Sequence, residues 1–277
     1  MTTPPVALSV AGTDSGGAAG LAADLTTFAA LGVHGACVVT AVTAQDTTGV
    51  RSVLRVPLAE VAAQLDAVLD DLPVAAAKTG MLGDPAVVEL VAHRLGGDRA
   101  RPLVVDPVLV ATSGAVLGDA AVAAAYARVL LPVAALATPN HDEARALLGR
   151  DLPPRESAAA LADTGCTVLL TGGDGAGEGA GGPGAGVTDW WAEPGLAPVP
   201  LAHVAVATHN DHGTGCTHSA ALAALLAGGG SARTAAEQAA ALVTERLRAG
   251  RDWRLGRGRG PVPHIDLTIR HPPQERP

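Results

Sequence analysis

The sequence of 277 residues is poor in aromatic side chains and in lysine. It has one Phe, one Tyr and three Trp, and Lys78 is its only lysine. Few aromatic rings are available to stack on nucleic-acid bases, and the net charge of −8 at pH 7 gives no electrostatic support for nucleic-acid binding. The core must therefore be built from Ala, Val and Leu, which suits a parallel sheet that is buried on both faces.

Cysteines and long apolar runs are also scarce. Cys37, Cys166 and Cys216 are odd in number and widely spaced, which excludes a disulfide framework and a zinc-binding spacing. No apolar run is long enough to cross a bilayer, and the N-terminus lacks the basic segment of a signal peptide. We therefore expect a cytoplasmic protein without a membrane partner.

Short apolar runs alternate with longer runs rich in Ala and Leu along most of the chain. This alternation predicts βαβ units and an α/β fold, in which helices cover both faces of a parallel sheet. We see no internal repeat or linker, and we predict one domain over residues 1–266 and a flexible tail at 267–277. Strands are expected at 6–11, 37–42, 75–78, 103–106, 134–137 and 167–170, and helices at 22–31, 58–69, 85–95, 119–130, 142–148, 157–163, 219–226 and 232–248.

Two stretches fall outside this alternation. Residues 172–186 are dense in glycine, which predicts a flexible hairpin or a disordered loop. Three prolines in 192–200 predict edge structure rather than a central strand.

Polar and glycine-rich segments follow the predicted strands. In an open parallel sheet, ligands bind outside the carboxyl ends of the strands, so these loops are expected to converge on one cleft. They span residues 12–20, 43–49, 78–83, 106–114, 138–143 and 171–174.

The segment HGTGCT at 212–217 stands just before the helix predicted from Ser219. Glycines allow a tight turn and the close approach of a ligand, and a helix start directs free N–H groups and a positive dipole end at one spot. This spot favours a phosphate or a developing oxyanion. The same field would lower the pKa of the Cys216 thiol and favour its thiolate.

Asn140 and Glu143 lie at the start of the helix predicted after Pro139. They could hold the water shell of Mg²⁺, which takes few direct carboxylate ligands. Alternatively, Asn140 caps the helix and Glu143 reaches back to complete a capping box. The local sequence alone favours the capping box.

Four other residues could contact a ligand or could be plain structure. Asp106 ends a strand, where it could meet a metal or a phosphate or simply form a turn. Asp24 could accept a hydrogen bond from a substrate or lie on a helix surface. Gln45 presents a donor and an acceptor together, which suits a ring with an amino group beside a ring nitrogen. Met81 could form an apolar wall for such a ring or fill the core.

Two other enzyme classes fit the sequence less well. His209, His212 and His218 lie near Cys216, as in a Cys–His hydrolase, but they are sequence neighbours without an evident third group, and His218 is expected at the surface or in packing. A dinucleotide-dependent dehydrogenase is disfavoured because the loop at 12–20 lacks the G-x-G-x-x-G spacing.

Seven blocks of the sequence resemble, in order, the hydroxymethylpyrimidine/phosphomethylpyrimidine kinases of the ribokinase-like superfamily. The match spans roughly residues 6–265, including a final GxGPVxH at 258–264. The blocks are AGTDSGGAAG at 11–20 with AD at 23–24, TAVTAQ at 40–45, KTGML at 78–82, DPV at 106–108, TPNxxE at 138–143, TGG at 171–173 and HGTGCT at 212–217.

The resemblance implies a three-layer αβα fold with a mostly parallel central sheet. It also implies ATP-dependent phosphorylation of 4-amino-5-hydroxymethyl-2-methylpyrimidine, and then of its monophosphate to the diphosphate, in thiamin biosynthesis. Gln45 would read the pyrimidine, Met81 and Val108 would line its pocket, and Asp24 and Gly12 would lie near it.

The phosphoryl group would be handled by the later blocks. By resemblance, Gly213, Thr214 and Gly215 form the anion hole, and Cys216 stands where related sugar kinases carry an aspartate base, so it would accept the proton. Glu143 and Asn140 would hold Mg²⁺ through water. The nucleotide would contact Asp106, Asn140, Thr171 and Gly173.

Three positions depart from the family pattern: Ala22 replaces a common glutamine, and Thr112 and Thr171 replace common lysines. The last two would alter phosphate or nucleotide contacts. Within the fold, a pyridoxal kinase is the alternative, because relatives accept pyridoxine-type rings, and a nonenzymatic nucleotide- or pyrimidine-binding protein is a further one. Relatives also suggest a homodimer.

Overall fold

The computed structural model describes residues 3–112, 114–172 and 186–265, and its centre is a sheet of eight strands in the order β10-β9-β8-β7-β6-β5-β1-β2. All neighbouring pairs from β2 to β8 are parallel, and β9 is antiparallel to both β8 and β10. The strands are β1 (Val6–Ala11), β2 (His34–Val39), β5 (Val74–Thr79), β6 (Leu103–Val105), β7 (Leu136–Ala137), β8 (Thr167–Leu170), β9 (Gly186–Ala192) and β10 (Val199–Val204).

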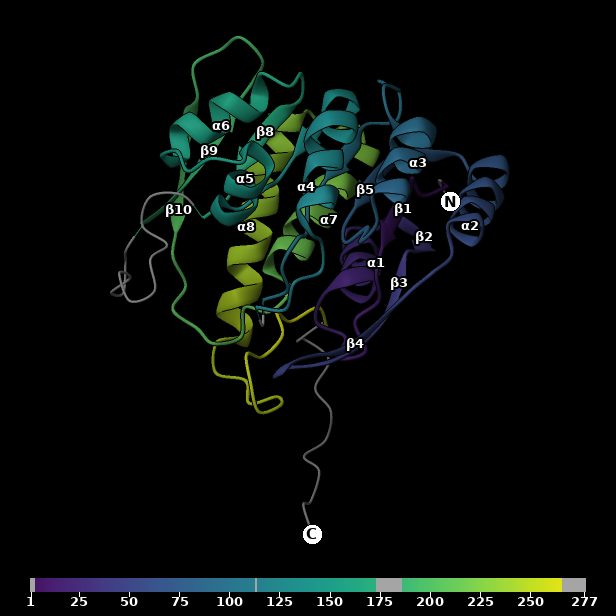
Figure 1. Cartoon of the computed structure of the whole chain (residues 1–277). Coiled ribbons are helices and arrows are strands. Elements are labelled where there is room, and N and C mark those ends of the chain that lie inside the picture. Colours follow the sequence, from purple (N-terminus) through teal and green to yellow (C-terminus); the bar gives the residue numbers. More distant parts are fainter. Residues whose placement is uncertain (1–2, 113, 173–185, 266–277) are drawn as a thin grey trace.

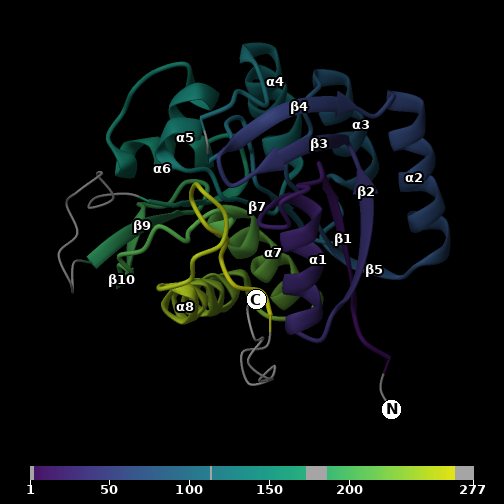
Figure 2. The same ribbon diagram turned by 90° about the horizontal axis from the view of Figure 1, so that it is seen from below.

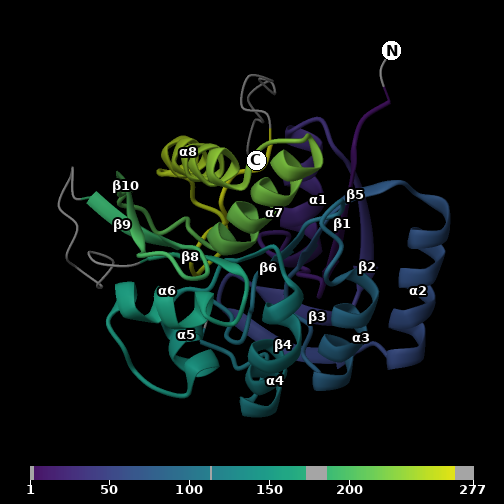
Figure 3. The ribbon, with the colours of Figure 1, turned by 90° about the horizontal axis from the view of Figure 1, so that it is seen from above.

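Helices cover both faces of this sheet, which confirms the predicted three layers (Figures 1, 2 and 3). One face carries α1 (Gly20–Ala30), α7 (Thr214–Ala227) and α8 (Ala232–Gly250). The other carries α2 (Leu58–Asp71), α3 (Pro85–Leu95), α4 (Ala120–Ala125), α5 (His141–Leu148) and α6 (Pro154–Ala162).

The sequence missed a hairpin that stands apart from the main sheet. We expected one strand over 37–42, but the chain leaves β2 at Thr40 and forms β3 (Ala41–Asp46) and β4 (Gly49–Arg55), a separate antiparallel pair. The Thr40 hydroxyl donates to the Met81 carbonyl over 2.6 Å, which fixes the point of departure. Figure 1 shows the hairpin beside the yellow segment that follows α8.

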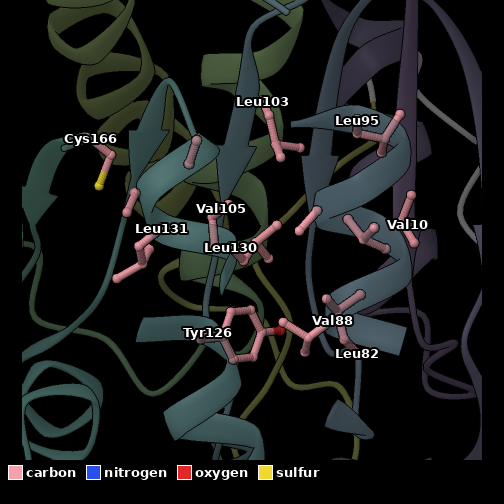
Figure 4. Packing of buried hydrophobic residues seen from close by; sticks show 14 of the residues in the cluster. Val10, Leu82, Val88, Leu95, Leu103, Val105, Tyr126, Leu130, Leu131 and Cys166 are labelled. Carbon is pink, nitrogen blue, oxygen red and sulfur yellow. The ribbon is translucent and has the colours of Figure 1, made fainter. Parts of the chain in front are cut away.

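The apolar core is aliphatic, as the composition predicts, and it lies on both faces of the sheet. Figure 4 shows Tyr126 among Leu82, Val88 and Leu130 in the larger of the two clusters. Its hydroxyl donates to the Gly80 carbonyl over 2.9 Å, so the one Tyr of the chain is both buried and hydrogen-bonded. Here the predicted helix over 119–130 continues past α4 as a π-helical turn η1 (Tyr126–Leu130) and a 3-10 turn η2 (Leu131–Val133).

Helix α7 begins at Thr214, five residues earlier than the predicted start at Ser219. Its residues from Thr217 to Ala224 are all buried, since α7 packs between α1 and α8 and against β5. A helix that is apolar on every side belongs in the interior. Because its apolar sequence places α7 in the interior, the N-terminal turn of the helix, with Cys216, also lies in the middle of the molecule.

Within the described residues, no helix is long and apolar enough to cross a membrane. The predicted tail at 267–277 and nearly all of the predicted glycine-rich loop at 172–186 lie outside the described residues.

Candidate active site

A cavity of about 640 Å³ opens at the carboxyl ends of the parallel strands. Each of the six polar segments that the sequence predicted to converge contributes at least one residue to its wall. The convergence is confirmed, because parallel strands that are fed by crossover helices deliver their loops to a single edge of the sheet. Gly12, Gln45, Met81, Asp106, Val108, Asn140, Glu143, Thr171, Gly213, Thr214, Gly215 and Cys216 all line the cavity; Gly173 lies outside the described residues.

The start of α7 meets the cavity at Gly213. Its φ of +88° lies in the left-handed region, and a Cβ at this position would overlap the carbonyl oxygen of Ala18. The loop before α1 therefore packs directly against the backbone of this turn. The helix N-terminus is held open toward the cavity, where its free N–H groups and dipole favour an anion.

The Cys216 thiol does not have the lowered pKa that we expected from the helix start. Burial raises its pKa to about 12, with the Asp106 and Asp24 carboxylates acting in the same direction and Lys78 acting against them. The prediction was wrong because the sequence revealed the helix dipole but not the depth of the site or its two nearby carboxylates. Without ligands, Cys216 is a thiol at neutral pH.

The one lysine of the chain lies beneath the cavity. The Lys78 side chain is fully buried, and its Nζ lies 2.8 and 3.0 Å from the two carboxylate oxygens of Asp24 and 3.7 Å from Asp106 Oδ2. Burial pulls the pKa of Lys78 down, but the charges of Asp24 and Asp106 act against burial, and the pKa lies above its ordinary value. Lys78 is thus a permanent cation between two acids.

The structure does not place Asp24 at the cavity wall, contrary to its predicted place beside the substrate. Asp24 is fully buried on α1, where its carboxylate binds Lys78 and accepts a hydrogen bond from the Ser9 hydroxyl over 2.6 Å. Asp106 does reach the cavity, and the Ser219 hydroxyl donates to its Oδ2 over 2.8 Å. Burial raises the pKa of Asp106, with Lys78 acting against this.

Asn140 and Glu143 form the capping box of α5. The Asn140 side chain accepts from the Glu143 N–H over 2.9 Å, and the Glu143 carboxylate accepts from the Asn140 N–H over 3.0 Å. Both residues nevertheless line the cavity. Burial, together with the charge of Asp106, raises the pKa of Glu143 to about 8. Two buried carboxyl groups thus face the same space, where a cation would favour their ionised forms.

At one end of the cavity, Gln45 lies beside residues that the sequence did not assign to the site. Gln45 Nε2 is 2.9 Å from His212 Nε2, which is 3.4 Å from Asp14 Oδ2. Met81 forms a wall here and packs so closely on Gly12 that a Cβ at Gly12 would collide with the Met81 methyl group. Because His212 Nε2 faces Gln45 and Asp14, it does not serve as the base of a Cys–His hydrolase.

The other end of the cavity is more apolar. Val187, Val204–Ala207, Ala240, Val243 and Leu247 line it, together with an ion pair in which His203 Nε2 lies 3.1 Å from Asp189 Oδ2. The Gly172 N–H donates to the other Asp189 oxygen over 2.9 Å. His218 also lines this end, with only 6% of its surface exposed, so the expectation of a surface position was wrong and that of a packing position holds.

Phosphoryl transfer needs positioning and charge neutralisation more than covalent work by the protein. In this three-layer αβα fold, the start of α7 can bind an anion and meets that need. It lies between one end of the cavity that carries paired hydrogen-bonding groups and another end that is apolar. These features define the class of the molecule as a small-molecule kinase of ribokinase-like fold.

Comparison with known proteins identifies the family. The family model described as phosphomethylpyrimidine kinase matches residues 14–263. A hydroxymethylpyrimidine/phosphomethylpyrimidine kinase from Synechococcus elongatus is 43% identical over 266 residues, which cover 94% of this chain and 97% of that protein. The thiamine biosynthesis bifunctional protein ThiED of Geobacter sulfurreducens is 42% identical over 263 residues, which cover 93% of this chain and 52% of that protein.

The structure of the pyridoxal kinase from Staphylococcus aureus in complex with AMP-PCP and pyridoxal is 30% identical, with a TM-score of 0.82, and covers 95% of this chain and 94% of that chain. The chain belongs to the phosphomethylpyrimidine kinase family. It is a phosphotransferase of thiamin biosynthesis that acts on a pyrimidine, which confirms the predicted family, fold and activity.

Proposed function

We propose that the cavity binds hydroxymethylpyrimidine or its monophosphate at the Gln45 end and ATP at the apolar end. The observation that carries this proposal is the position of the α7 N-terminus on the wall shared by both ends. A volume of about 640 Å³ lies within the range of about 300–1,000 Å³ that is usual for ligand pockets. In one cavity, the acceptor hydroxyl and the γ-phosphate can meet at the helix start.

In the reaction, the hydroxymethyl oxygen attacks the γ-phosphorus, the bond from that phosphorus to the bridging oxygen breaks, and ADP leaves. In the second step, a phosphate oxygen of the monophosphate is the nucleophile. The backbone of Gly213, Thr214 and Gly215 at the helix start stabilises the charge of the transferred group. Cys216 accepts the proton of the hydroxyl, and Lys78 assists because its charge lowers the thiol pKa.

The donor set at the strand ends fits Mg²⁺. Asp106 and Glu143 both line the cavity, and Mg²⁺ takes one or two carboxylates while it keeps waters and binds phosphates. Neither Lys nor Arg lines the cavity among the residues the structure describes, and Thr112 and Thr171 are part of that wall. When bound, Mg²⁺ would neutralise nucleotide phosphates and offset both carboxylates.

The β3–β4 hairpin supports the proposal of a homodimer. Its Val42, Val53 and Leu54 side chains are exposed, Leu54 to 70%, although they are apolar. Val42 and Leu54 are paired across the two strands, so they lie on one face of the hairpin, and Val53 lies on the opposite face. Exposed apolar patches mark interaction surfaces, and a second copy of the hairpin would cover Val42 and Leu54 by a two-fold contact. We also propose a single domain over 1–266, and a cytoplasmic location for a chain whose three cysteines are free.

A pyridoxal kinase activity is the second candidate, supported by the likeness to the pyridoxal kinase from Staphylococcus aureus. The test is to incubate the purified protein with Mg-ATP and, separately, hydroxymethylpyrimidine, its monophosphate and pyridoxal, and to follow ADP and products by mass spectrometry. We expect turnover of both pyrimidines. Turnover of pyridoxal alone would overturn the proposal in favour of the second candidate.

A further inference from the structure

His212 is held in place by the segment that follows α8. Its backbone N–H donates to the Gly260 carbonyl, and its own carbonyl accepts from the Val262 N–H, each over 3.0 Å. The residue is buried, with 6% of its surface exposed, and its ring lines the cavity. This position directs the imidazole toward Gln45 and fixes it there.

In the structure, the amide nitrogen of Gln45 is the atom that faces His212. An amide nitrogen carries two hydrogens and accepts nothing, so Gln45 Nε2 donates and His212 Nε2 accepts over 2.9 Å. This direction places the ring hydrogen on Nδ1, which is buried and has no hydrogen-bond partner among the described residues. This leaves Gln45 one further N–H and the carbonyl Oε1, which together form a donor and acceptor pair.

Asp14 is the second group that faces His212 Nε2, and it lies farther away than Gln45. Its carboxylate already accepts from the N–H groups of Gly16, Ala18 and Ala19 over 2.8 to 3.0 Å. It lies 3.4 Å from His212 Nε2, which is longer than an ordinary hydrogen bond. The loop before α1 thus holds the aspartate in place, and Gln45 makes the shorter of the two contacts with the imidazole.

We infer that His212 is a positioning residue for substrate specificity, which fixes the Gln45 amide so that it reads an aminopyrimidine. Gln45 Oε1 accepts from the exocyclic amino group, the free N–H of Gln45 donates to the adjacent ring nitrogen, and His212 accepts the remaining hydrogen. Every polar atom of the amide is then paired. The inference rests on the proposed pyrimidine substrate.

The test compares two substrates on matched variants. One is 4-amino-5-hydroxymethyl-2-methylpyrimidine, and the other is the same ring without the 4-amino group. His212→Phe keeps an aromatic ring without the acceptor, and His212→Gln returns an acceptor oxygen. His209→Phe is the matched control, since His209 is exposed and lies off the cavity wall. Thermal melts establish that each variant folds.

We expect His212→Phe to raise KM for the amino substrate about tenfold, the effect of one lost hydrogen bond, with kcat changed less than about twofold. KM for the ring without the amino group should stay within about twofold, so that discrimination between the two rings falls. His212→Gln should restore much of it, and His209→Phe should match the wild type. In a Gln45→Leu background, His212→Phe should have no further effect on KM.

The outcomes distinguish a failure of the proposed function from a failure of the proposed role of His212. A wild-type protein that does not phosphorylate the amino substrate would contradict the proposed function itself. A wild type that does, together with His212→Phe proteins that affect both rings equally or add fully to Gln45→Leu, would overturn the role of His212. A fall in kcat alone would also overturn it, because that result would assign His212 to the anion hole.

Discussion

At the scale of single residues, Lys78 links the fold to the chemistry. It neutralises Asp24 and Asp106, two acids that are both buried, and neither acid has another cationic side chain within 4.0 Å among the described residues. Removing one partner of a buried ion pair leaves an uncompensated charge. Removal of Lys78 alone is therefore expected to destabilise the fold.

We expect Lys78→Met to lower the free energy of unfolding by about 3–5 kcal/mol, as measured by urea denaturation. Lys78→Met/Asp24→Asn should lose less, because the uncompensated charge at Asp24 is removed as well. Arg94→Met is the control, because its partner Asp66 is exposed, and it should change stability by less than about 1 kcal/mol. A Lys78→Met protein as stable as the wild type would contradict this account.

Cys216 gives a second prediction at this scale. With a pKa near 12, the thiol of the ligand-free protein should alkylate slowly at pH 8, and its rate with iodoacetamide should still rise above pH 10. Peptide mapping by mass spectrometry separates it from Cys37 and Cys166, which burial also makes less acidic. Cys216→Ala should lower kcat about 10²–10⁴-fold with substrate binding retained by calorimetry. Fast alkylation at pH 7 would refute the raised pKa.

At the scale of elements, the start of α7 depends on one glycine. Gly213→Ala would place a methyl group against the Ala18 carbonyl and would force a side chain into left-handed backbone. We expect a loss of more than about 1 kcal/mol in unfolding free energy, along with the loss of kinase activity.

The control lies two residues further along the same turn. A Cβ at Gly215 meets nothing within 4 Å, so Gly215→Ala should melt at nearly the wild-type temperature whatever it does to activity. Equal melting temperatures for the two variants would show that the turn does not need its left-handed residue.

The elements also show which parts of the secondary structure can be predicted from the sequence. The helix predicted at 85–95 coincides with α3, whose N-cap is Asp84, which accepts from the Ala86 N–H; such a start depends only on neighbours in the chain. The hairpin β3–β4 was missed, because it is defined by a departure from the sheet that a hydroxyl bond to Met81 fixes, 41 residues away. The early start of α7 was missed because glycine reads as a helix breaker unless its surroundings are known.

For the site, the motifs could be predicted from the sequence, but the contacts between them could not. The predicted loops do converge, since the alternation of strands and helices requires it. The pairing of Gln45 with His212 joins residues 167 positions apart, and the charged groups that act on the Cys216 pKa, Lys78, Asp106 and Asp24, come from distant parts of the sequence. Neither leaves a local signal in the sequence.

At the scale of the whole molecule, the exposed apolar face of β3–β4 predicts the oligomeric state. We expect the wild type to elute as a dimer in size-exclusion chromatography with light scattering, and Leu54→Asp to shift it toward the monomer. Leu196→Asp is a matched control, since Leu196 is similarly exposed at 63% but lies in the turn between β9 and β10. A wild-type monomer at all concentrations tested would contradict the proposed dimer.

Because its only lysine is buried, the folded protein offers amine-reactive reagents almost no group to modify. The Lys78 side chain has no exposed area, so an N-hydroxysuccinimide ester should modify the native chain once, at its terminal α-amine. A second label, at Lys78, should appear only after the region around the cavity has opened. The number of labels per chain, counted by intact mass, would thus report unfolding of this region without any engineered probe.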